Sequence, residues 1–370
     1  MKPDHKFIGL DHLRALAISL VFVYHYTAFQ HPDWMNNHFI HFGWCGVDLF
    51  FVLSGFLISN QLFEEWQKRR SISLGVFYLK RAFRIFPPYF FVLLIYIFIP
   101  AFHERETLPP LLKMFTFTQN YNQDISTYGT FSHAWSLCVE EQFYLLLPLM
   151  LIGVLSSRLN QKAGWLIPAV FLLTLLLRWI TWNLYLKPFQ DTDDFTMNWY
   201  RLIYYPTYTR LDGLITGVGI AAIYRFRESW FFAVKRFANW ILLVGLMVFI
   251  VSFYICIDQH APAATLIGFS TIAIAFGLFV LSAILPGSIL FRTKSVVTKN
   301  LATLSYSLYL SHKGIIHLTQ KWLSALGVQG DSNITLLICI LTCLAGAVCM
   351  RLLIEIPFFR LRNSILKYIS

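Results

Sequence analysis

Long apolar stretches, separated by short polar segments, run along the whole chain. Ten of them reach or approach the roughly 20 residues that a helix needs to cross the hydrocarbon core of a bilayer. The pattern therefore predicts an all-α, polytopic membrane protein with about ten transmembrane helices. The shortest stretch could form a tilted or partly re-entrant helix. The ten stretches are residues 12–30, 43–63, 82–102, 133–156, 165–186, 211–226 (the shortest), 238–257, 263–285, 302–320 and 333–357.

The amino-acid composition also indicates a membrane protein and excludes several other classes of protein. Hydrophobic residues make up 57% of the 370 residues and charged residues only 13%, whereas a soluble domain has about 25% charged residues. The same balance excludes disordered, fibrous and disulfide-stabilised chains. The six cysteines lie mostly within apolar stretches and lack the spacing of metal ligands. We predict no metal site and interpret the cysteines as packing residues.

The distribution of positive charge predicts which side each loop faces. If the N-terminus is cytoplasmic, 20 of the 30 Lys and Arg residues fall in cytoplasmic segments, and only six fall in outer segments. This asymmetry obeys the positive-inside rule and places both termini in the cytoplasm. The formal net charge of +11 is then a property of loops and does not indicate a nucleic-acid partner. The cytoplasmic set includes Lys2, Lys6, Lys68, Arg69, Arg70, Lys80, Arg81, Arg84, Arg158, Lys162, Arg225, Arg227, Lys235 and Arg236.

We expect residues 1–370 to form a single membrane domain with no fused extracytoplasmic domain, because the last predicted span ends about a dozen residues before Ser370. The first span has polar residues at its entry and is followed by no small-residue cleavage site, so it is interpreted as retained rather than as a signal peptide. The outer loops 103–132 and 187–210 are polar and aromatic, and they could shape the mouth of a site.

Ionisable residues within the spans are the candidate functional groups, because burying them in hydrocarbon is costly. Arg14 and His25 share the first span and are 11 residues apart, which is within about 20° of three full helical turns. Both side chains therefore lie on one helix face, separated by about 16 Å along the axis. Arg14 could bind an anion near the cytoplasm while His25 transfers a proton in the outer half. Equally, Arg14 could reach lipid phosphates and His25 could be structural.

The second span, "GWCGVDLFFVLSGFLIS", places Asp48 at about the depth of His25. Asp48 could orient the imidazole of His25 and stabilise its protonated form, or it could cap a helix at the interface. Ser54 and the neighbouring glycines allow helices to approach closely. We also assign Ser54 to the predicted pocket.

Basic residues cluster where the third span begins, in "YLKRAFRIFPPYF". Arg81 and Arg84 are three residues apart and lie on one side of the helix. They could bind phosphate or pyrophosphate, or they could be an ordinary cytoplasmic anchor. Two consecutive prolines then interrupt the backbone hydrogen bonds and could open space between helices.

Two adjacent carboxylates lie about two turns into the fourth span, in "HAWSLCVEEQFYLLLPL". Glu140 and Glu141 point about 100° apart, so we expect only one of them to face a cavity directly. Because burial of two carboxylates is costly, a functional glutamate is favoured here. Aromatic residues could form an interfacial belt or a surface for sugar stacking. From this motif Trp135, Ser136 and Tyr144 are assigned to the pocket.

Two later spans carry further polar pairs. Arg210 and Asp212 lie at the outer entry of the sixth span, in "TRLDGLITGVGIA". His312 and Lys313 lie in the middle of the ninth span, in "LSYSLYLSHKGII", where packing alone does not explain them. We predict that these four residues line the same polar cavity as His25.

Five motifs in order resemble the integral-membrane acyltransferase 3 family, whose members acylate cell-surface glycans and related acceptors. They are "LDHLRALAISLVFVYH", "GVDLFFVLSGFLIS", "KRAFRIFPPY", "WSLCVEEQFY" and "YSLYLSH", and the resemblance covers nearly the whole chain. It implies a ten-helix core, an acyl-CoA donor from the cytoplasm, and an acceptor reached from outside or from the membrane. It also implies that Arg14 and His25 match the family's essential pair. Some relatives carry a fused esterase-like domain, which we do not expect in this chain.

The expected function is therefore O-acyl transfer, most simply O-acetyl transfer, from acyl-CoA to a hydroxyl of a cell-surface or lipid-linked glycan such as lipopolysaccharide or another polysaccharide. Arg14, Arg81 and Arg84 would hold the donor. His25, with Asp48, Glu140 and Glu141, would carry the chemistry, by direct transfer or through an acyl-enzyme. No cofactor would be bound permanently, and the enzyme would reside among the lipids of the bacterial cytoplasmic membrane. A proton-coupled transporter of a small polar or anionic solute is the alternative, because it needs the same buried polar groups.

Overall fold

Helices form all the regular secondary structure in residues 7–156 and 164–369, which are the residues that the computed structural model describes. Eight helical segments in these ranges are long and apolar enough to cross a membrane. This confirms an all-α polytopic membrane protein, while the number ten stays a prediction. Lys2, Lys6, Arg158 and Lys162, which contribute to the predicted cytoplasmic charge, lie outside the described residues.

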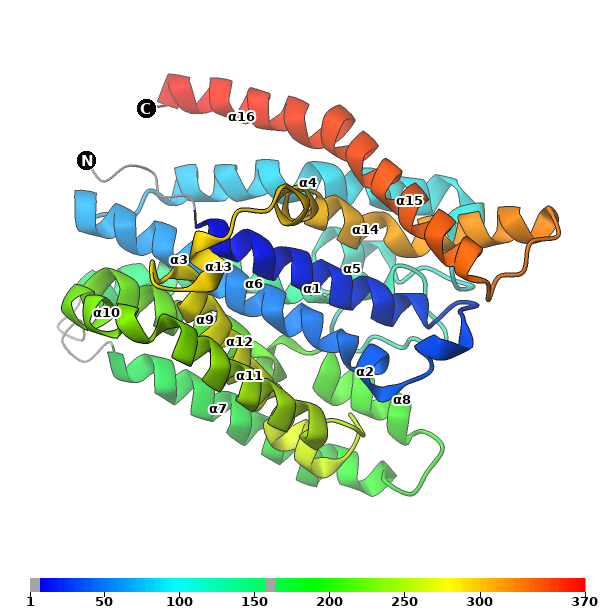
Figure 1. The fold of residues 1–370 in the computed structure, drawn as a ribbon, viewed down its shortest axis with the longest axis horizontal. Helices are drawn as coiled ribbons and strands as arrows, with labels where there is room; N and C mark the ends of the chain where they lie inside the picture. The colour runs from blue at the N-terminus through cyan, green and yellow to red at the C-terminus, as the bar shows by residue number, and fades with distance from the viewer. Residues whose placement is uncertain (1–6, 157–163, 370) are drawn as a thin grey trace.

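The observed helices follow the predicted apolar stretches to within a few residues at most ends (Figure 1). The clearest differences are α4, which begins at Leu74 rather than at residue 82, α14, which is longer than its apolar core, and the last span. That span continues through a π-helical turn at Arg351–Glu355 into a further helix. The helices are α1 (Ile8–Tyr26), α2 (His38–His41), α3 (Gly46–Arg69), α4 (Leu74–Phe98), α5 (Leu111–Phe115), α6 (Trp135–Ser156), α7 (Leu166–Thr181), α8 (Phe195–Trp199), α9 (Leu211–Phe226), α10 (Glu228–Val234), α11 (Ala238–Ile255), α12 (Phe269–Ile284), α13 (Ile289–Arg292), α14 (Val296–Ala325), α15 (Asn333–Met350) and α16 (Ile356–Ile369).

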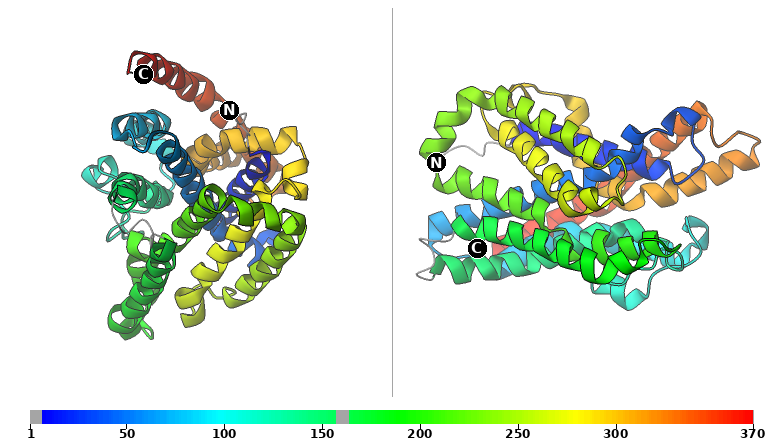
Figure 2. Two further views of the ribbon diagram at one scale, coloured as in Figure 1. Left: turned by 90° about the vertical axis from the view of Figure 1, so that its left-hand side faces the viewer. Right: turned by 90° about the horizontal axis from the view of Figure 1, so that it is seen from below.

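The bundle has central helices and peripheral ones. In the segment that contains α3, 83% of the apolar window is buried, whereas the segment that contains α11 has only 17% buried. The exposed side chains of α11 are apolar, as expected for a helix that faces lipid. The apolar window of the segment that contains α12 is likewise 78% buried, and Figure 2 shows α16 along the flank of the bundle. Functional groups that need protection from lipid therefore belong on the central helices.

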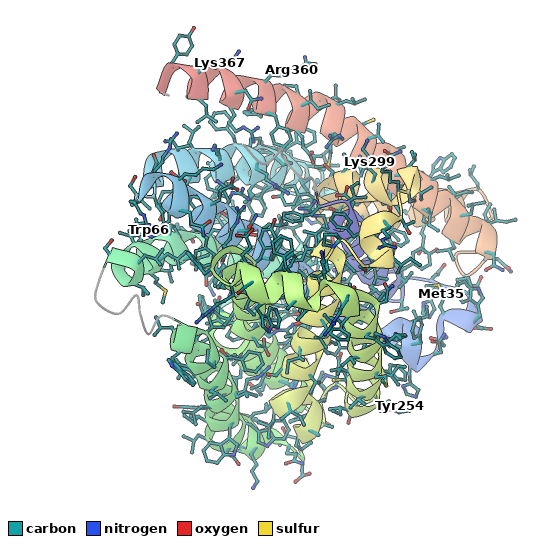
Figure 3. The ribbon with its side chains drawn as sticks, turned by 60° about the vertical axis from the view of Figure 1, so that its left-hand side comes forward. Met35, Trp66, Tyr254, Lys299, Arg360 and Lys367 are labelled. Carbon is teal, nitrogen blue, oxygen red and sulfur yellow. The ribbon has the colours of Figure 1, made fainter. Side chains whose placement is uncertain are left out.

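The two ends of the bundle can be told apart by the segments they contain, while the predicted cytoplasmic location of the termini stays a prediction. The start of α1 and the end of α16 lie at the same end (Figure 1). Met35 in the loop after α1 and Trp66 near the end of α3 lie toward opposite ends (Figure 3). Figure 3 also shows Arg360 and Lys367 on α16. We refer to the end that contains Met35 as the outer end, following the predicted sidedness.

Glycines allow α3 and α9 to pack backbone to backbone. A Cβ atom built on Gly55 would lie 2.0 Å from the carbonyl oxygen of Leu214, and one on Gly217 would lie 2.3 Å from that of Val52. Neither distance is sterically allowed, so no larger residue fits at these positions without moving a helix. This close contact brings the start of α9 against α3, where both helices carry buried charges.

Two buried ion pairs and one hydrogen bond join α3, α7, α9 and α12. Nη2 of Arg210, the residue before α9, lies 2.8 Å from Oδ1 of Asp48 on α3. Nη1 of Arg178 on α7 lies 2.9 Å from Oδ2 of Asp212 on α9, and the hydroxyl of Ser270 on α12 donates to the same carboxylate oxygen. All four charged side chains are at most 1% exposed. We call these four residues the charged core.

Removing one charge from the charged core should destabilise the protein. Asp48→Asn leaves the guanidinium of Arg210 buried without its counter-charge, and the expected loss is about 3 to 5 kcal/mol. Thermal and denaturant-induced unfolding of the purified protein in detergent measures the loss. Asp33→Asn, at an exposed position in the outer loop, is the matched control and should change stability by less than about 0.5 kcal/mol. Equal stability of both variants would contradict a structural role for Asp48.

Candidate active site

A pocket of about 490 Å³ lies at the outer end of α1. Its wall includes three residues that the sequence assigned to the site, namely His25, Trp135 and Lys313. The remainder comes from the end of α1 and the residues that follow it, from residues 41–47, from the outer loop 103–132 with His133, and from residues 197–205. The structure therefore brings together the first, fourth and ninth predicted spans around one polar cavity.

His25 forms a direct hydrogen bond with His312 across the interface of α1 and α14. Nδ1 of His25 lies 2.8 Å from Nε2 of His312, although the two residues are 287 positions apart in the sequence. Nδ1 of His312 lies 2.9 Å from the carbonyl oxygen of Leu308 and 3.0 Å from that of Tyr309. His25 is half-buried and lines the pocket, whereas His312 is buried behind it.

A third histidine, which the sequence analysis did not single out, completes the cluster. His133 lines the pocket, and its ring centroid lies 5.8 Å from that of His25 and 5.2 Å from that of His312. Its Nε2 lies 3.3 Å from the carbonyl oxygen of Leu310. The sequence did contain a feature that could have identified His133. It lies two residues before Trp135, in a motif already chosen for its polar groups. Three imidazoles from α1, α14 and the start of α6 therefore meet at the pocket.

Lys313 is neutralised by a residue of the outer loop. Its Nζ lies 3.3 Å from Oε1 of Glu104, and the same oxygen accepts a hydrogen bond from the backbone N–H of Phe131. The pair thus ties both ends of the loop 103–132 to α14, over the pocket. Within that loop, hydrogen bonds from Ser126, and then from Thr127, hold the pKa of the Asp124 carboxyl below its usual range.

Aromatic side chains form a further part of the pocket wall. Tyr200, Tyr204, Tyr205 and Trp135 all line the pocket. The ring of Trp135 lies 4.8 Å from that of Tyr204 and 5.4 Å from that of Tyr205, measured between centroids. A π-helical turn at Tyr200–Tyr204 presents these tyrosines. Flat aromatic faces beside hydrogen-bonding groups suit a ligand that has both apolar and hydroxyl-bearing faces.

The expectation that Asp48 orients His25 is wrong. The carboxylate of Asp48 pairs with Arg210, and the ring nitrogen of His25 bonds to His312 instead. Arg210 is fully buried over the ring of Phe269, with its guanidinium carbon 4.0 Å from the ring centroid, and Asp212 pairs with Arg178. These three residues do not line the described pocket. A buried carboxylate is stabilised by a nearby opposite charge. For Asp48, helix packing brings Arg210 into that position, which the spacing of residues in the sequence did not reveal.

Glu140 and Glu141 also lie away from the described pocket. Ser54 donates a hydrogen bond of 2.6 Å to Oε1 of Glu140, and Arg81 donates one of 3.1 Å to Gln61. Glu141 interacts electrostatically with Arg81. The carboxylates therefore face a second polar region, nearer the cytoplasmic end.

This inner region connects to Arg14. Arg14 interacts electrostatically with Arg84 and with Tyr144, and Arg84 interacts with Glu140. Nη1 of Arg14 lies 3.5 Å from Oδ1 of Asp11 on the same helix. We call Arg14, Arg81, Arg84, Glu140 and Tyr144 the inner polar cluster. It places the three predicted donor-binding arginines in one region between α1, α4 and α6.

Ser136 supports the histidines rather than the pocket surface. Its hydroxyl lies 2.5 Å from the hydroxyl of Tyr309, and Tyr309 donates a hydrogen bond of 2.6 Å to the carbonyl oxygen of His133. This chain holds the start of α6 against α14. Among the described residues, no group of three His, Cys, Asp or Glu side chains is arranged to hold a metal ion.

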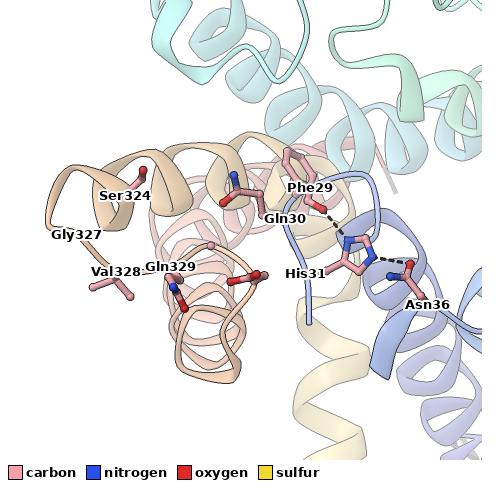
Figure 4. A pocket seen from close by; sticks show the side chains of 10 residues that line it. Phe29, Gln30, His31, Asn36, Ser324, Gly327, Val328 and Gln329 are labelled. Atoms are coloured by element: carbon pink, nitrogen blue, oxygen red, sulfur yellow. Dashed lines mark hydrogen bonds between the residues drawn. The ribbon is translucent and has the colours of Figure 1, made fainter. Parts of the chain in front are cut away.

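A second pocket, of about 630 Å³, lies beside the first at the outer end (Figure 4). Its wall begins at Phe29, one residue after Ala28, which lines the first pocket. His31 shapes it by contacts of 2.7 Å to the carbonyl oxygen of Phe29 and 2.9 Å to the side chain of Asn36. None of the intramembrane candidates lines it, so we place the chemistry in the first pocket.

Comparisons with a family profile and with curated proteins both match acyltransferases. A sequence profile described as "Acyltransferase domain" matches residues 7–353. The peptidoglycan O-acetyltransferase OatA of Listeria monocytogenes is 30% identical over 84% of this chain, and the O-acetyltransferase OatA of Staphylococcus aureus is 29% identical over 83%. The chain spans about half the length of these curated relatives, 49% and 50% respectively. No solved structure matches the chain.

The Lys313–Glu104 pair generates a prediction about the outer loop. Glu104→Gln leaves the buried ammonium of Lys313 without its counter-charge, and we expect a loss of about 3 kcal/mol in stability. The loop 103–132 should also become more sensitive to limited proteolysis, because one of its ties to α14 is weakened. Glu106→Gln, two residues away and exposed, is the control. Unchanged cleavage and unfolding of the Glu104 variant would show that the pair does not hold the loop.

Proposed function

Because this chain belongs to the acyltransferase 3 family, we propose that it is a membrane O-acetyltransferase that moves an acetyl group from cytoplasmic acetyl-CoA to a hydroxyl of a cell-envelope glycan. The observation that carries the proposal is the position of His25, a half-buried imidazole in the outer pocket, on the same continuous helix as Arg14 in the inner polar cluster. Relatives named as O-acetyltransferases support the acetyl group.

The inner polar cluster is the proposed site of the nucleotide end of the donor. Arg14, Arg81 and Arg84 offer guanidinium groups that bind phosphate oxygens through two parallel hydrogen bonds. Glu140 and Glu141 partly offset their mutual repulsion while the site is empty. From Arg14 to His25 the rise along α1 is about 16 Å. An extended pantetheine arm is comparable with that length and would bring the thioester to the outer pocket.

The outer pocket is the proposed acceptor site. Its aromatic wall can stack on the apolar face of a sugar ring, while histidine and hydroxyl groups bind the sugar's hydroxyls. Lys313 is already neutralised by Glu104 and serves to hold the loop above the pocket. Peptidoglycan, named for one relative, and a lipid-linked or lipopolysaccharide saccharide are the acceptors to compare.

In the proposed step, His25 is the catalytic base. It takes the proton from the acceptor hydroxyl as that oxygen attacks the thioester carbonyl carbon. The carbon–sulfur bond then breaks, and the departing thiolate receives the proton from His25. The products are the O-acetyl ester and free coenzyme A. No permanently bound cofactor takes part.

The fold is that of an integral membrane protein, and we propose the bacterial cytoplasmic membrane as its location. Only there can one protein reach cytoplasmic acetyl-CoA from one end and an envelope glycan from the other. Membrane lipids are its surroundings and the donor and acceptor are its partners; the proposal includes no nucleic acid.

Removing His25 should abolish transfer while leaving the protein folded. We expect His25→Ala to lower O-acetylation by on the order of 100-fold or more, the contribution of a positioned general base. The measurement is ester-linked acetate released by mild alkali from cell-envelope glycans of cells that lack the gene and express each variant. His38→Ala, an exposed histidine of the outer loop, should behave as the wild type.

The same assay can defeat the proposal. Full acetylation by a folded His25→Ala protein would remove His25 from the chemistry. Purified wild-type protein that transfers no label from radioactive acetyl-CoA to peptidoglycan fragments or to lipopolysaccharide oligosaccharide, yet moves a solute across vesicles, would favour the transporter.

Arg14 should affect donor binding rather than acceptor binding. Arg14→Gln removes charge-assisted hydrogen bonds to phosphate, so the Kd for acetyl-CoA should rise by on the order of tenfold. Arg14→Lys keeps the positive charge but loses the planar guanidinium group. Its Kd for acetyl-CoA should lie between those of the wild type and the Gln variant. Calorimetric titration with acetyl-CoA in detergent measures this. Arg69→Gln, at an exposed cytoplasmic position, is the control, and equal affinity of all four proteins would place the nucleotide elsewhere.

A further inference from the structure

We propose that His312 is the positioning residue for the catalytic base: it determines which ring nitrogen of His25 carries the hydrogen, and so leaves Nε2 of His25 free to accept a proton. This inference rests on the proposed function. It assigns a role to a residue that sequence analysis placed only among the pocket residues, and it replaces the role expected of Asp48.

The protonation of His312 follows from its own contacts. Its Nδ1 lies 2.9 Å and 3.0 Å from the carbonyl oxygens of Leu308 and Tyr309, one turn earlier on α14. A carbonyl oxygen can only accept a hydrogen bond, so Nδ1 of His312 must carry a hydrogen and donate it. In a neutral imidazole the other nitrogen then holds a lone pair. Nε2 of His312 is therefore an acceptor.

The acceptor role of Nε2 of His312 determines which ring nitrogen of His25 carries the hydrogen. Nδ1 of His25 lies 2.8 Å from Nε2 of His312, and one of the two nitrogens must be the donor. Because Nε2 of His312 is the acceptor, Nδ1 of His25 carries the hydrogen. The lone pair of neutral His25 is thus on Nε2, which has no hydrogen-bond partner among residues 7–156 and 164–369. His25 lines the pocket, where a free lone pair is what a general base requires.

The arrangement differs from the more familiar carboxylate-oriented histidine. Here a neutral side chain holds the imidazole, and the carboxylate of Glu104, which is tied to this region, is bound to Lys313. His312 is 1% exposed on a helix of 30 residues, so its position is set by packing. It therefore orients the base without adding negative charge. The opposite tautomer of His25 would present an N–H to the acceptor hydroxyl and could not take its proton.

Three substitutions separate positioning from general structural support. In His312→Gln the amide oxygen can occupy the place of Nε2 and accept from His25. In His312→Asn the shorter side chain reaches only the place of Nδ1, so the acceptor is lost. In His312→Leu no polar group remains. Each variant is purified in detergent, and its Tm, its KM for acetyl-CoA and its kcat for acetyl transfer to the acceptor that the wild type acetylates are measured.

If His312 positions His25, the Gln variant keeps kcat within about tenfold of the wild type, while the Asn and Leu variants lose on the order of 100-fold. KM for acetyl-CoA stays unchanged in all three. If His312 only supports the fold, kcat instead follows Tm, and Gln shows no advantage over Asn. Wild-type kcat in a folded Leu variant would overturn the proposal. Absence of acetyl transfer by the wild type itself would count against the proposed function instead.

Discussion

The cost of burying an unpaired charge in an apolar interior controls where each polar residue of this protein lies. Asp48, Arg178, Arg210 and Asp212 are almost completely buried, and each has an opposite charge within hydrogen-bond distance. They form the charged core that joins α3, α7, α9 and α12. With those charges mutually satisfied, they have no electrostatic reason to face a ligand. The groups that do face the pocket include imidazoles and aromatic hydroxyls, together with Arg105 and with Lys313, which Glu104 already compensates.

The same constraint explains how the packing builds the site around α1. Gly55 and Gly217 bring α9 against α3, which allows the charged core to close beside the pocket without entering it. On the other side, α14 packs along α1 and supplies His312 at the height of His25. One helix, α1, therefore joins an arginine in the inner polar cluster to an imidazole in the outer pocket. In the proposed reaction, the donor enters from the cytoplasm and the acceptor arrives from outside, and they meet along this helix.

The histidine cluster gives the pocket its chemical character. His25, His133 and His312 come from α1, from the turn that precedes α6 and from α14, and their rings lie within 6 Å of one another by centroid. Backbone carbonyl groups determine the protonation of His312, and through it that of His25. A base of this kind needs no nearby carboxylate. This fits a reaction in which a proton leaves a hydroxyl and returns to a thiolate, so that no charge has to persist in the pocket between turnovers.

The sequence by itself determined the class of fold, the approximate spans, their predicted sidedness and the placement of Arg14 and His25 on one helix face. These properties depend on hydrophobic length, on charge counts and on spacing within one helix, all of which are local. Only the tertiary structure decided that Asp48 pairs with Arg210, that Glu140 belongs to the inner polar cluster with Glu141 beside its Arg81, and that His312 and His133 surround His25. Those contacts join residues on different helices, up to 287 positions apart. The periodicity of a helix states which face is polar, but it does not state which partner helix that face will meet.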